Sequence, residues 1–283
     1  MLQTYCTIFC PDMHRPFVDI WYYFMEIQIT AMDESYLKAL AAHNDRGNYR
    51  EEFVNALSKI FADVKLGGVR SCLAIGPGDG WFEIQFIKHS GANISKFIGI
   101  EPDHASAEHL RTSLRYSLPG VESQVIETTV QNWEGPDIPV YLITMFQVLY
   151  HVHVSADERQ ECLKKIHDSW LVSGGYVAVV TASRTKSPHS PATIYERLGS
   201  PHPTWEEIEA DFLKAGFTKY YEHEMHVEKD FTDPGENLLP FYQPYFKKGS
   251  ITVADLRDAM TGPFLEGKKV EAFATMAIFR STN

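Results

Sequence analysis

Apolar runs typical of buried strands alternate with helical patterns over most of the chain, and this alternation predicts an α/β fold. Strands are expected at 71–75, 97–101, 123–126, 140–146, 176–181, 217–227 and 272–279. Helices are expected at 49–64, 81–89, 106–117, 157–170 and 205–215, with another that begins near residue 33 and ends near residue 45. Strands that alternate with helices form a mostly parallel sheet covered on both faces. We therefore expect a Rossmann-like, doubly wound, mostly parallel sheet of seven strands.

Two segments do not fit this alternation. Residues 1–33 are rich in aromatic and β-branched side chains but show no clean period, so we treat them as an N-terminal extension of uncertain structure. Residues 183–204 are rich in Pro, Ser and His and are expected to form a loop. The remainder, 34–283, is expected to form a single domain with its ligand beyond the carboxyl ends of the strands.

A glycine-rich turn follows the first expected strand. Gly76, Gly78 and Gly80 stand at alternate positions between the apolar run Cys72–Ile75 and the next helical pattern. Glycine is needed where the backbone turns with positive φ and where a ligand lies against the main chain. The next apolar run ends in Glu101, 21 residues after Gly80, where an acid can bind the hydroxyls of a nucleotide ribose.

The spacing of the glycines excludes two classes of nucleotide site. A dinucleotide fingerprint, G-x-G-x-x-G, would need glycine at position 81, where Trp81 stands. No G-x-x-x-x-G-K-[ST] motif occurs, so a P-loop is excluded as well.

Composition and charge narrow the class of partner. The net charge of −11 and the lack of a Lys/Arg cluster oppose nucleic-acid binding, which draws most of its affinity from cations on phosphates. A small-molecule partner is expected instead. No run of 18 apolar residues and no basic segment before an apolar stretch occur, so we expect no membrane span and no secretory signal.

Four cysteines are too few and too scattered for a disulfide framework, which favours a reducing cytoplasm. Cys72 and Cys162 are expected to be packing thiols. Cys6 and Cys10 lack the second pair that a zinc site would need, and no metal site is expected.

Beyond the glycine turn, several motifs resemble histamine N-methyltransferase and its relatives, which are class I methyltransferases that use S-adenosyl-L-methionine. The similarity covers roughly residues 34–283. It is carried by Ala-Ile-Gly-Pro-Gly-Asp-Gly at 74–80, Glu101-Pro102, Glu-Thr-Thr at 127–129, Met-Phe-Gln-Val-Leu-Tyr-His at 145–151 and Ile-Tyr-Glu-Arg-Leu-Gly at 194–199. The resemblance implies a Rossmann-like methyltransferase that acts as a cytoplasmic monomer on a small amine or imidazole. It also implies a small substrate-binding lid, with insertions near 184–205 and 230–265.

Carried over by position, the resemblance assigns residues to two halves of a site. The cofactor would contact Gly76, Gly78, Gly80, Glu101, Ser106, Thr129 and Phe146, with Thr129 near the adenine. The methyl acceptor would contact Gln147, His151 and Tyr195, and the catalytic residues would be Gln147 and His151. Tyr150, between them in the chain, is either a further acceptor contact or a packing residue.

The sequence departs from the family at several positions. Ala74 replaces the usual acid two residues before the first glycine, so the methionine amino group needs another partner. The family's substrate-gripping Glu falls near Asp45 or Arg46, and its Asn on the last strand falls near Ala272. An indole of the family's pocket falls near Pro191.

The chemistry of the acceptor depends on its protonation. An imidazole, with a pKa of about 6.5, is largely neutral at pH 7, whereas a primary amine near 10.4 must lose a proton at a cost of roughly 4–5 kcal/mol. Gln147 can accept an imidazole N–H, and His151 can accept a hydrogen bond or act as a base. The aromatic segment at 241–246, which includes Phe241 and Tyr242, is either a pocket wall for a cationic group or ordinary core.

Three functions stay open from the sequence. The first is N-methylation of an imidazole or amine. The second keeps the cofactor but methylates a hydroxyl or a carboxylate, because fold does not fix the substrate. The third is a non-catalytic homologue that binds S-adenosylmethionine.

Overall fold

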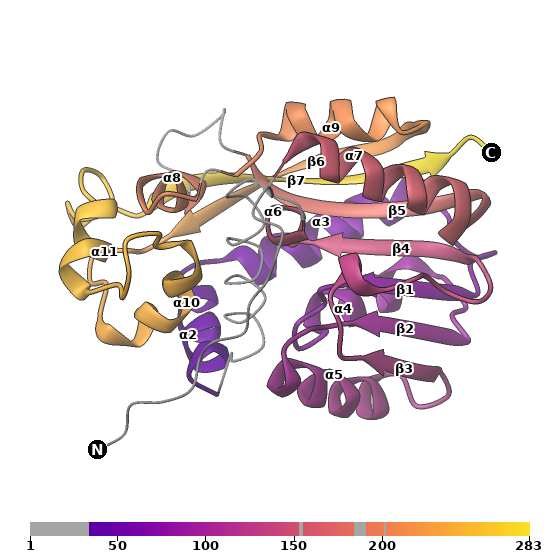
Figure 1. Cartoon of the computed structure of the whole chain (residues 1–283), viewed down its shortest axis with the longest axis horizontal. Coiled ribbons are helices and arrows are strands. Elements are labelled where there is room, and N and C mark those ends of the chain that lie inside the picture. Colours follow the sequence, from indigo (N-terminus) through magenta and orange to yellow (C-terminus); the bar gives the residue numbers. More distant parts are fainter. Residues whose placement is uncertain (1–33, 153–154, 184–190, 201) are drawn as a thin grey trace, which may run out of the picture.

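The computed structural model describes residues 34–283 apart from 153–154, 184–190 and 201, and it contains one seven-stranded sheet. The strand order is β3-β2-β1-β4-β5-β7-β6 (Figure 1). The strands are β1 (Ser71–Ile75), β2 (Lys96–Ile100), β3 (Glu122–Ile126), β4 (Val140–Phe146), β5 (Leu171–Ser183), β6 (Phe217–Lys229) and β7 (Val270–Ser281). Neighbouring strands are parallel except for β7, which is antiparallel to both β5 and β6. The predicted Rossmann-like, mostly parallel sheet is confirmed.

Strand β1 is apolar from Cys72 to Ile75 because helices cover both of its faces. Cys72 and Ala74 lie in the core that α3 and α4 share with the sheet, whereas Leu73 and Ile75 face the opposite layer. Leu73 pairs with Ile98 of β2 and with Ile143 of β4. This register brings the carboxyl ends of the three strands to one edge of the sheet.

Helices form a layer on each face of the sheet and a separate group at its carboxyl edge. Those that contribute to the two layers are α3 (Tyr49–Asp63), α4 (Trp81–Ser90), α5 (His104–Ser117), α7 (Ala156–Lys165) and α9 (Trp205–Lys214). The short α6 (Leu149–Val152) follows β4. Side chains cap the N-termini of several of these helices. At α5, Asp103 accepts the backbone N–H of Ser106. At α7 and α9, Ser155 and Thr204 form capping boxes with Glu158 and Glu207, respectively.

The remaining helices pack together beyond the carboxyl ends of the strands (Figure 1). They are α2 (Glu34–Asn44), α8 (Pro191–Arg197), α10 (Leu239–Tyr242) and α11 (Val253–Ala259), and we call these helices, together with the segment 230–265 that contains α10 and α11, the lid. The lid has its own core, which contains Ile194, Tyr195, Phe231, Tyr242 and Phe264. Residues 1–33 and parts of the expected insertion at 184–205 lie outside the described residues, and the division into domain and lid insertions stays a prediction.

The structure corrects two of the expected elements. The loop expected at 183–204 contains α8, because Ile194, Tyr195 and Leu198 recur at helical spacing and are buried in the lid core. The helix expected at 157–170 is α-helical only to Lys165 and ends in a π-helical segment, Ile166–Trp170, after which β5 begins earlier than expected.

None of the helices that the structure describes is both long enough and apolar enough to cross a membrane.

Candidate functional site

The three glycines of the turn between β1 and α4 share a backbone conformation but differ in their surroundings. All three have positive φ: 60° at Gly76, 57° at Gly78 and 77° at Gly80. A Cβ at Gly76 would lie 2.4 Å from Val148, and one at Gly80 would lie 2.3 Å from Leu110. A Cβ at Gly78 would meet nothing within 4 Å. The turn is therefore fixed by packing at its two ends and leaves open space at its middle glycine, where a ligand can lie against the main chain.

Glu101 follows directly after β2 and is bonded to this turn. Its carboxylate accepts the backbone N–H of Gly78 at 2.8 Å and that of Asp103 at 3.1 Å. Burial raises the pKa of Glu101 to about 7, although both backbone donors oppose the shift. An acid held by the glycine turn and by the loop before α5 is well placed to bind vicinal hydroxyls.

Ser106 and Thr129 follow β2 and β3 at the same edge of the sheet, Ser106 in α5 and Thr129 in the loop after β3. Ser106 is buried in the first turn of α5, with its backbone N–H bonded to Asp103. The hydroxyl oxygen of Thr129 is buried and has no hydrogen-bond partner. A buried polar atom without a partner is costly, so this hydroxyl is suited to a ligand group.

Phe146, also expected at the cofactor, ends β4 and is only 5% exposed. Its ring lies 5.6 Å from that of Phe53 and 5.5 Å from that of Phe86, in the core under α3 and α4. The cofactor role of Phe146 stays a prediction.

Gln147, which follows Phe146, has an uncommon backbone conformation. Its φ of 54° is the only positive value at a non-glycine position among the described residues. Its backbone N–H donates to the carbonyl of Val180 at 2.8 Å, and its side-chain Nε2 donates to the Tyr49 hydroxyl at 2.8 Å. These two bonds hold the residue in a region that costs about 1 kcal/mol or more. The Oε1 of the same amide has no hydrogen-bond partner within the described structure and remains available as an acceptor.

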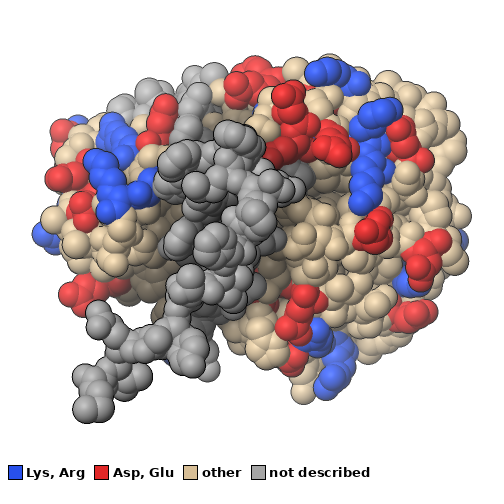
Figure 2. Space-filling model, in the orientation of Figure 1, with Lys and Arg blue, Asp and Glu red and all other residues tan. Residues whose placement is uncertain are grey.

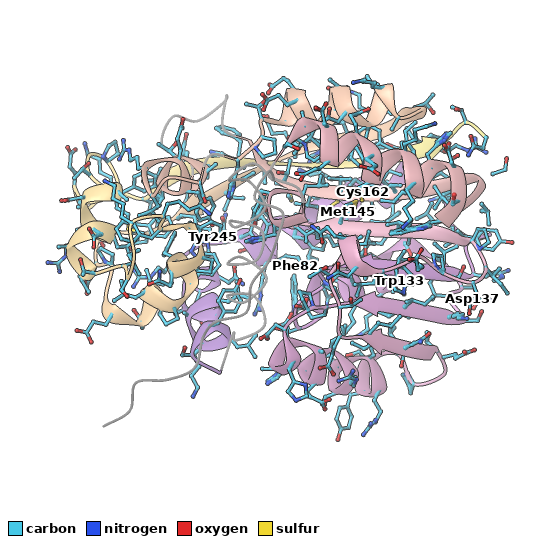
Figure 3. All side chains as sticks on the ribbon, in the orientation of Figure 1. Phe82, Trp133, Asp137, Met145, Cys162 and Tyr245 are labelled. Atoms are coloured by element: carbon cyan, nitrogen blue, oxygen red, sulfur yellow. The ribbon has the colours of Figure 1, made fainter. Side chains whose placement is uncertain are left out.

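Aromatic rings from α6, which follows Gln147 in the chain, and from the lid gather in one cluster. The ring of Tyr150 stacks on that of His202 at 4.0 Å, and Tyr195 lies 4.4 Å from His202 and 4.2 Å from Tyr245. Figure 3 labels Tyr245 in the lid and Phe82 at the start of α4, on the sheet side. The ring of Tyr150 lies 4.6 Å from that of His151 and 6.3 Å from that of Tyr195, so these three predicted acceptor residues lie together.

His151 is bonded to the lid through the Tyr245 hydroxyl, 2.9 Å from its Nε2. Burial, and to a smaller extent the charge of Lys247, lowers the pKa of His151 to about 4. The imidazole is therefore neutral at pH 7 and is a weak base.

The other two predicted acceptor residues, Phe241 and Tyr242, lie deeper in the lid against α2. The ring of Phe241 stacks on that of His43 at 4.3 Å. The Tyr242 hydroxyl lies 3.1 Å from the Nδ1 of His43, and the Nζ of Lys229 lies 3.2 Å from its Nε2. Lys229 is 4% exposed, and burial lowers its pKa to about 7.

Three of the positions that depart from the family, Asp45, Arg46 and Ala272, are not among these residues. Asp45 is exposed beyond the end of α2, and the backbone carbonyl of Arg46 accepts the N–H of Asp230. Ala272 is buried in β7. The buried polar residue of the segment around α2 is His43, which the sequence analysis did not select.

Sequence reasoning also missed Tyr49, His202 and Lys229. Tyr49 stands at the first position of the apolar stripe of its helix, and this pattern predicts a core residue. The burial of Lys229 could have been predicted from the sequence, because the alternation in β6 places it on the buried face with Met225 and Val227. No pattern around His202 marked it.

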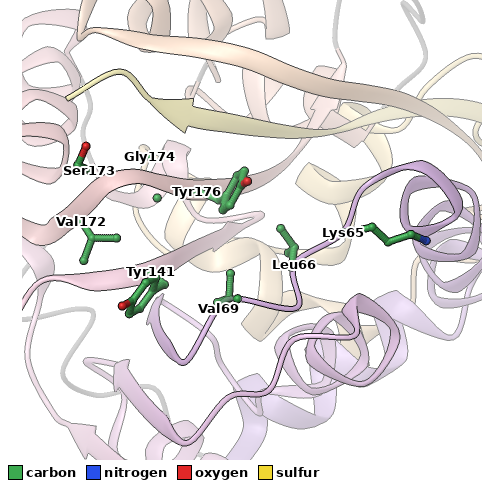
Figure 4. A pocket seen from close by; sticks show the side chains of 10 residues that line it. Lys65, Leu66, Val69, Tyr141, Val172, Ser173, Gly174 and Tyr176 are labelled. Atoms are coloured by element: carbon green, nitrogen blue, oxygen red, sulfur yellow. The ribbon is translucent and has the colours of Figure 1, made fainter.

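A small cavity lies at the opposite edge of the sheet (Figure 4). It measures about 210 Å³ and is lined by residues such as Lys65, Tyr141 and Tyr176, near the amino ends of β1, β4 and β5. Its volume is below that of typical ligand pockets, which begin at about 300 Å³. None of the candidate site residues lines it.

Comparisons with known proteins agree with this topology. No protein-family model and no curated protein sequence matches the chain. Among solved structures, one from Bacillus halodurans that is assigned as a methyltransferase is 14% identical, covers 81% of this chain and 99% of its own, and has a TM-score of 0.56. The cyclopropane synthase MmaA2 from Mycobacterium tuberculosis is 13% identical over 80% of this chain and 82% of its own, with a TM-score of 0.52.

The cyclase SpnF is also similar, with 12% identity, coverage of 81% of this chain and 80% of its own, and a TM-score of 0.50. At such low identities the likeness concerns the fold, and proteins of this fold carry out different reactions. The chain has the Rossmann-like fold of class I S-adenosylmethionine-dependent methyltransferases.

Proposed function

We propose that this protein is an enzyme that transfers a methyl group from S-adenosylmethionine to a nitrogen of a small molecule, in the manner of histamine N-methyltransferase. The cofactor would supply an electrophilic methyl group on its sulfonium. The residues of the chain would bind the cofactor, hold the acceptor nitrogen in line with that methyl group and exclude water. Positioning of this kind can lower a barrier by roughly 7–11 kcal/mol.

The residues around the glycine turn fit such a cofactor. Open space lies over Gly78, the buried acid Glu101 is available for ribose hydroxyls, and Thr129 offers a hydroxyl without a partner. These groups come from the loops after β1, β2 and β3, the edge at which ligands bind in open α/β sheets.

The proposal that the methyl acceptor is a nitrogen rests on the side chain of Gln147. Its amide is held by Tyr49, its backbone has a strained conformation, and its Oε1 is free to accept an N–H. Acceptance of the N–H of one imidazole nitrogen would leave the lone pair of the other nitrogen to react. Strained backbone that the surrounding structure enforces is concentrated at functional sites.

The acceptor is expected to arrive without a proton on the reacting nitrogen. With a pKa of about 4, His151 is too weak a base to take a proton from an alkylammonium of pKa about 10.4. A neutral imidazole needs no such base. The stacked rings of Tyr150, Tyr195 and His202 would form an aromatic wall for such an acceptor.

A small-molecule partner also agrees with the surface charge. Figure 2 shows Lys and Arg interspersed with Asp and Glu on the coloured part of the visible face, without a continuous basic surface of the kind that nucleic acids need. We propose a monomer in the cytoplasm with no nucleic-acid or membrane partner.

A second candidate function is methylation of a hydroxyl or a carboxylate with the same cofactor. It is favoured by Lys229, a buried amine at the lid that has no carboxylate partner in the described part of the chain. A cation there would attract an acidic substrate and would repel an ammonium.

Calorimetric titration tests the first function against the second. The protein is titrated with S-adenosylhomocysteine and then with histamine, neutral imidazoles, arylalkylamines and aromatic carboxylates. Micromolar or tighter binding of S-adenosylhomocysteine, followed by an imidazole or amine and its methylated product, supports N-methylation. Turnover of a hydroxyl or carboxylate compound selects the second function, and cofactor binding without any product selects a non-catalytic homologue. No binding of S-adenosylhomocysteine would contradict all three.

A further inference from the structure

Glu83 is a buried acid that the proposed reaction has not used so far. It lies in the first turn of α4, three residues after Gly80, and is 1% exposed. Its Oε2 is buried and has no hydrogen-bond partner. A buried carboxylate oxygen in this state is costly and is rare in folded proteins, so it calls for a partner that the chain does not supply.

The surroundings of Glu83 place it between the two halves of the candidate site. On one side, α4 begins at the glycine turn, which is bonded to Glu101 through the N–H of Gly78. On the other side, the ring of Phe82, the residue before Glu83, lies 5.4 Å from that of Tyr49, whose hydroxyl accepts a hydrogen bond from Gln147. The first turn of α4, which contains Glu83, therefore connects the turn held by Glu101 with the helix that holds Gln147.

A second unpartnered atom, of opposite charge, lies at the same helix start. Arg50, in the first turn of α3, has a buried Nε without a hydrogen-bond partner. Its guanidinium lies 5.0 Å from the ring of Trp81, and its Nη2 lies 3.9 Å from the carboxylate of Asp79. Trp81 and Asp79 both adjoin the first turn of α4, which Glu83 closes. The first turn of α4 therefore contains an acid with one buried oxygen that has no hydrogen-bond partner, and it lies beside a base whose buried Nε has none either.

These two groups match a zwitterion. The methionine part of S-adenosylmethionine carries an α-ammonium and an α-carboxylate, and it lies between the ribose and the transferred methyl group. The strand below contributes only apolar side chains here, Ala74 and Ile75, so that it offers no side-chain partner for the ammonium. We propose that Glu83 binds the α-ammonium and Arg50 binds the α-carboxylate of the cofactor's methionine part.

The electrostatics of Glu83 agree with this role. Burial, followed by the charges of Asp79 and Glu101, raises its pKa well above the ordinary value, and its backbone N–H opposes the shift. The other titratable groups that interact with it, Cys72 and Tyr49, are neutral at pH 7, since their ordinary pKa values lie above 7 and burial raises them further. An ammonium beside Glu83 would favour its ionised form and relieve the cost of burial.

This inference rests on the proposed function, and ligand truncation separates the two. S-adenosylhomocysteine and 5′-methylthioadenosine share the adenosine and the thioether, but only the first carries the amino acid. Glu83→Gln keeps the size of the side chain and removes its charge. It should weaken S-adenosylhomocysteine roughly ten- to a hundredfold, as expected for loss of a charged hydrogen bond, and leave 5′-methylthioadenosine within twofold. Glu101→Gln is the matched control and should weaken both ligands, because both contain the ribose.

Decarboxylated S-adenosylmethionine tests the two ends separately, because it keeps the ammonium and lacks only the carboxylate. Glu83→Gln should weaken its binding, whereas Arg50→Met should weaken S-adenosylmethionine but not the decarboxylated compound. Thermal unfolding of each variant confirms that it is folded.

Equal loss of both ligands in Glu83→Gln, or no loss of either, would overturn the assignment while the cofactor proposal stands. A wild-type protein that binds neither ligand would instead overturn the proposed function.

Discussion

The Nε2 of Gln147 donates a hydrogen bond to the hydroxyl of Tyr49 over 2.8 Å, and this bond joins the end of β4 to the first turn of α3. It orients an amide whose backbone has a φ of 54°. Tyr49 is 7% exposed, and the Nζ of Lys229 lies 5.6 Å from the centre of its ring. Gln147, the residue expected to bind the acceptor, is therefore positioned by a side chain of helix α3.

Tyr49→Phe should loosen Gln147 without disturbing the cofactor half of the site. Loss of this hydrogen bond is expected to lower the free energy of unfolding by about 1 kcal/mol. A misoriented amide should reduce kcat/KM for the acceptor roughly tenfold, because alignment carries much of the catalysis. Steady-state kinetics and calorimetry with S-adenosylhomocysteine measure the two effects.

Tyr141→Phe is a suitable control for this change, since Tyr141 is an exposed tyrosine at the opposite edge of the sheet. It should leave both quantities unchanged. Equal losses of acceptor turnover and cofactor affinity in Tyr49→Phe would show that Tyr49 supports the fold and not the orientation of Gln147.

Glu101→Gln should stabilise the ligand-free protein in alkaline solution while it weakens cofactor binding. Burial raises the pKa of Glu101 from 4.5 to about 7. An acid whose pKa is raised in the folded state adds stability below about pH 4.5, and this stability is lost as the pH rises to about 7. Above pH 7 the ionised carboxylate costs up to about 3 kcal/mol, which the amide of glutamine avoids.

Thermal unfolding at pH 5 and pH 8 measures how the difference in stability between Glu101→Gln and wild type depends on pH. The advantage of Glu101→Gln in Tm should be larger at pH 8 than at pH 5. A difference between variant and wild type that is the same at both pH values would mean that the carboxylate is not desolvated as the structure indicates.

The fold was largely predictable because its strands are strongly patterned. The apolar run of β1 and the three glycines after it marked the first strand, the turn and the edge at which a ligand binds. Glu101 was found from its place after the second strand, and the structure bonds it to that turn.

The lid and the supporting residues were less predictable, since their roles depend on contacts between distant segments. Tyr49 and Gln147 are 98 residues apart, and His43 and Lys229 are 186 residues apart. The burial of Glu83 was unpredictable for a similar reason. A helical pattern places a polar residue on the solvent side, and only the tertiary fold shows that this one is buried. Periodicity describes each segment alone, so it does not report such pairs.

Lys229→Met should remove a dependence of stability on pH between 7 and 10. Burial lowers the pKa of Lys229 from 10.5 to about 7. A base with a lowered pKa gives full stability above its unfolded pKa of about 10.5 and loses it as the pH falls to about 7. Wild-type protein should therefore gain about 2 kcal/mol relative to the variant between pH 7 and pH 9.

Urea unfolding of both proteins at the two pH values measures this difference. Lys219→Met is a matched control, because Lys219 lies in the same strand but is partly exposed and paired with Glu209 and Glu222. A constant difference between Lys229→Met and wild type across this range would show that the Lys229 amine does not titrate there.

The pH dependence of kcat/KM, measured at saturating cofactor, should identify the ionisation of the acceptor itself. With an imidazole acceptor the rate should rise through a pKa near 6.5 and then stay level to pH 9, because His151, with a pKa of about 4, remains neutral throughout. His151→Asn should lower the height of this profile without shifting it, and Lys229→Met removes the titration of the buried amine near pH 7 from the profile. A rate that keeps rising towards pH 10 would instead indicate an alkylammonium acceptor that loses its proton to solvent. A shift of the profile in His151→Asn would make His151 a general base and would contradict the role that its burial implies.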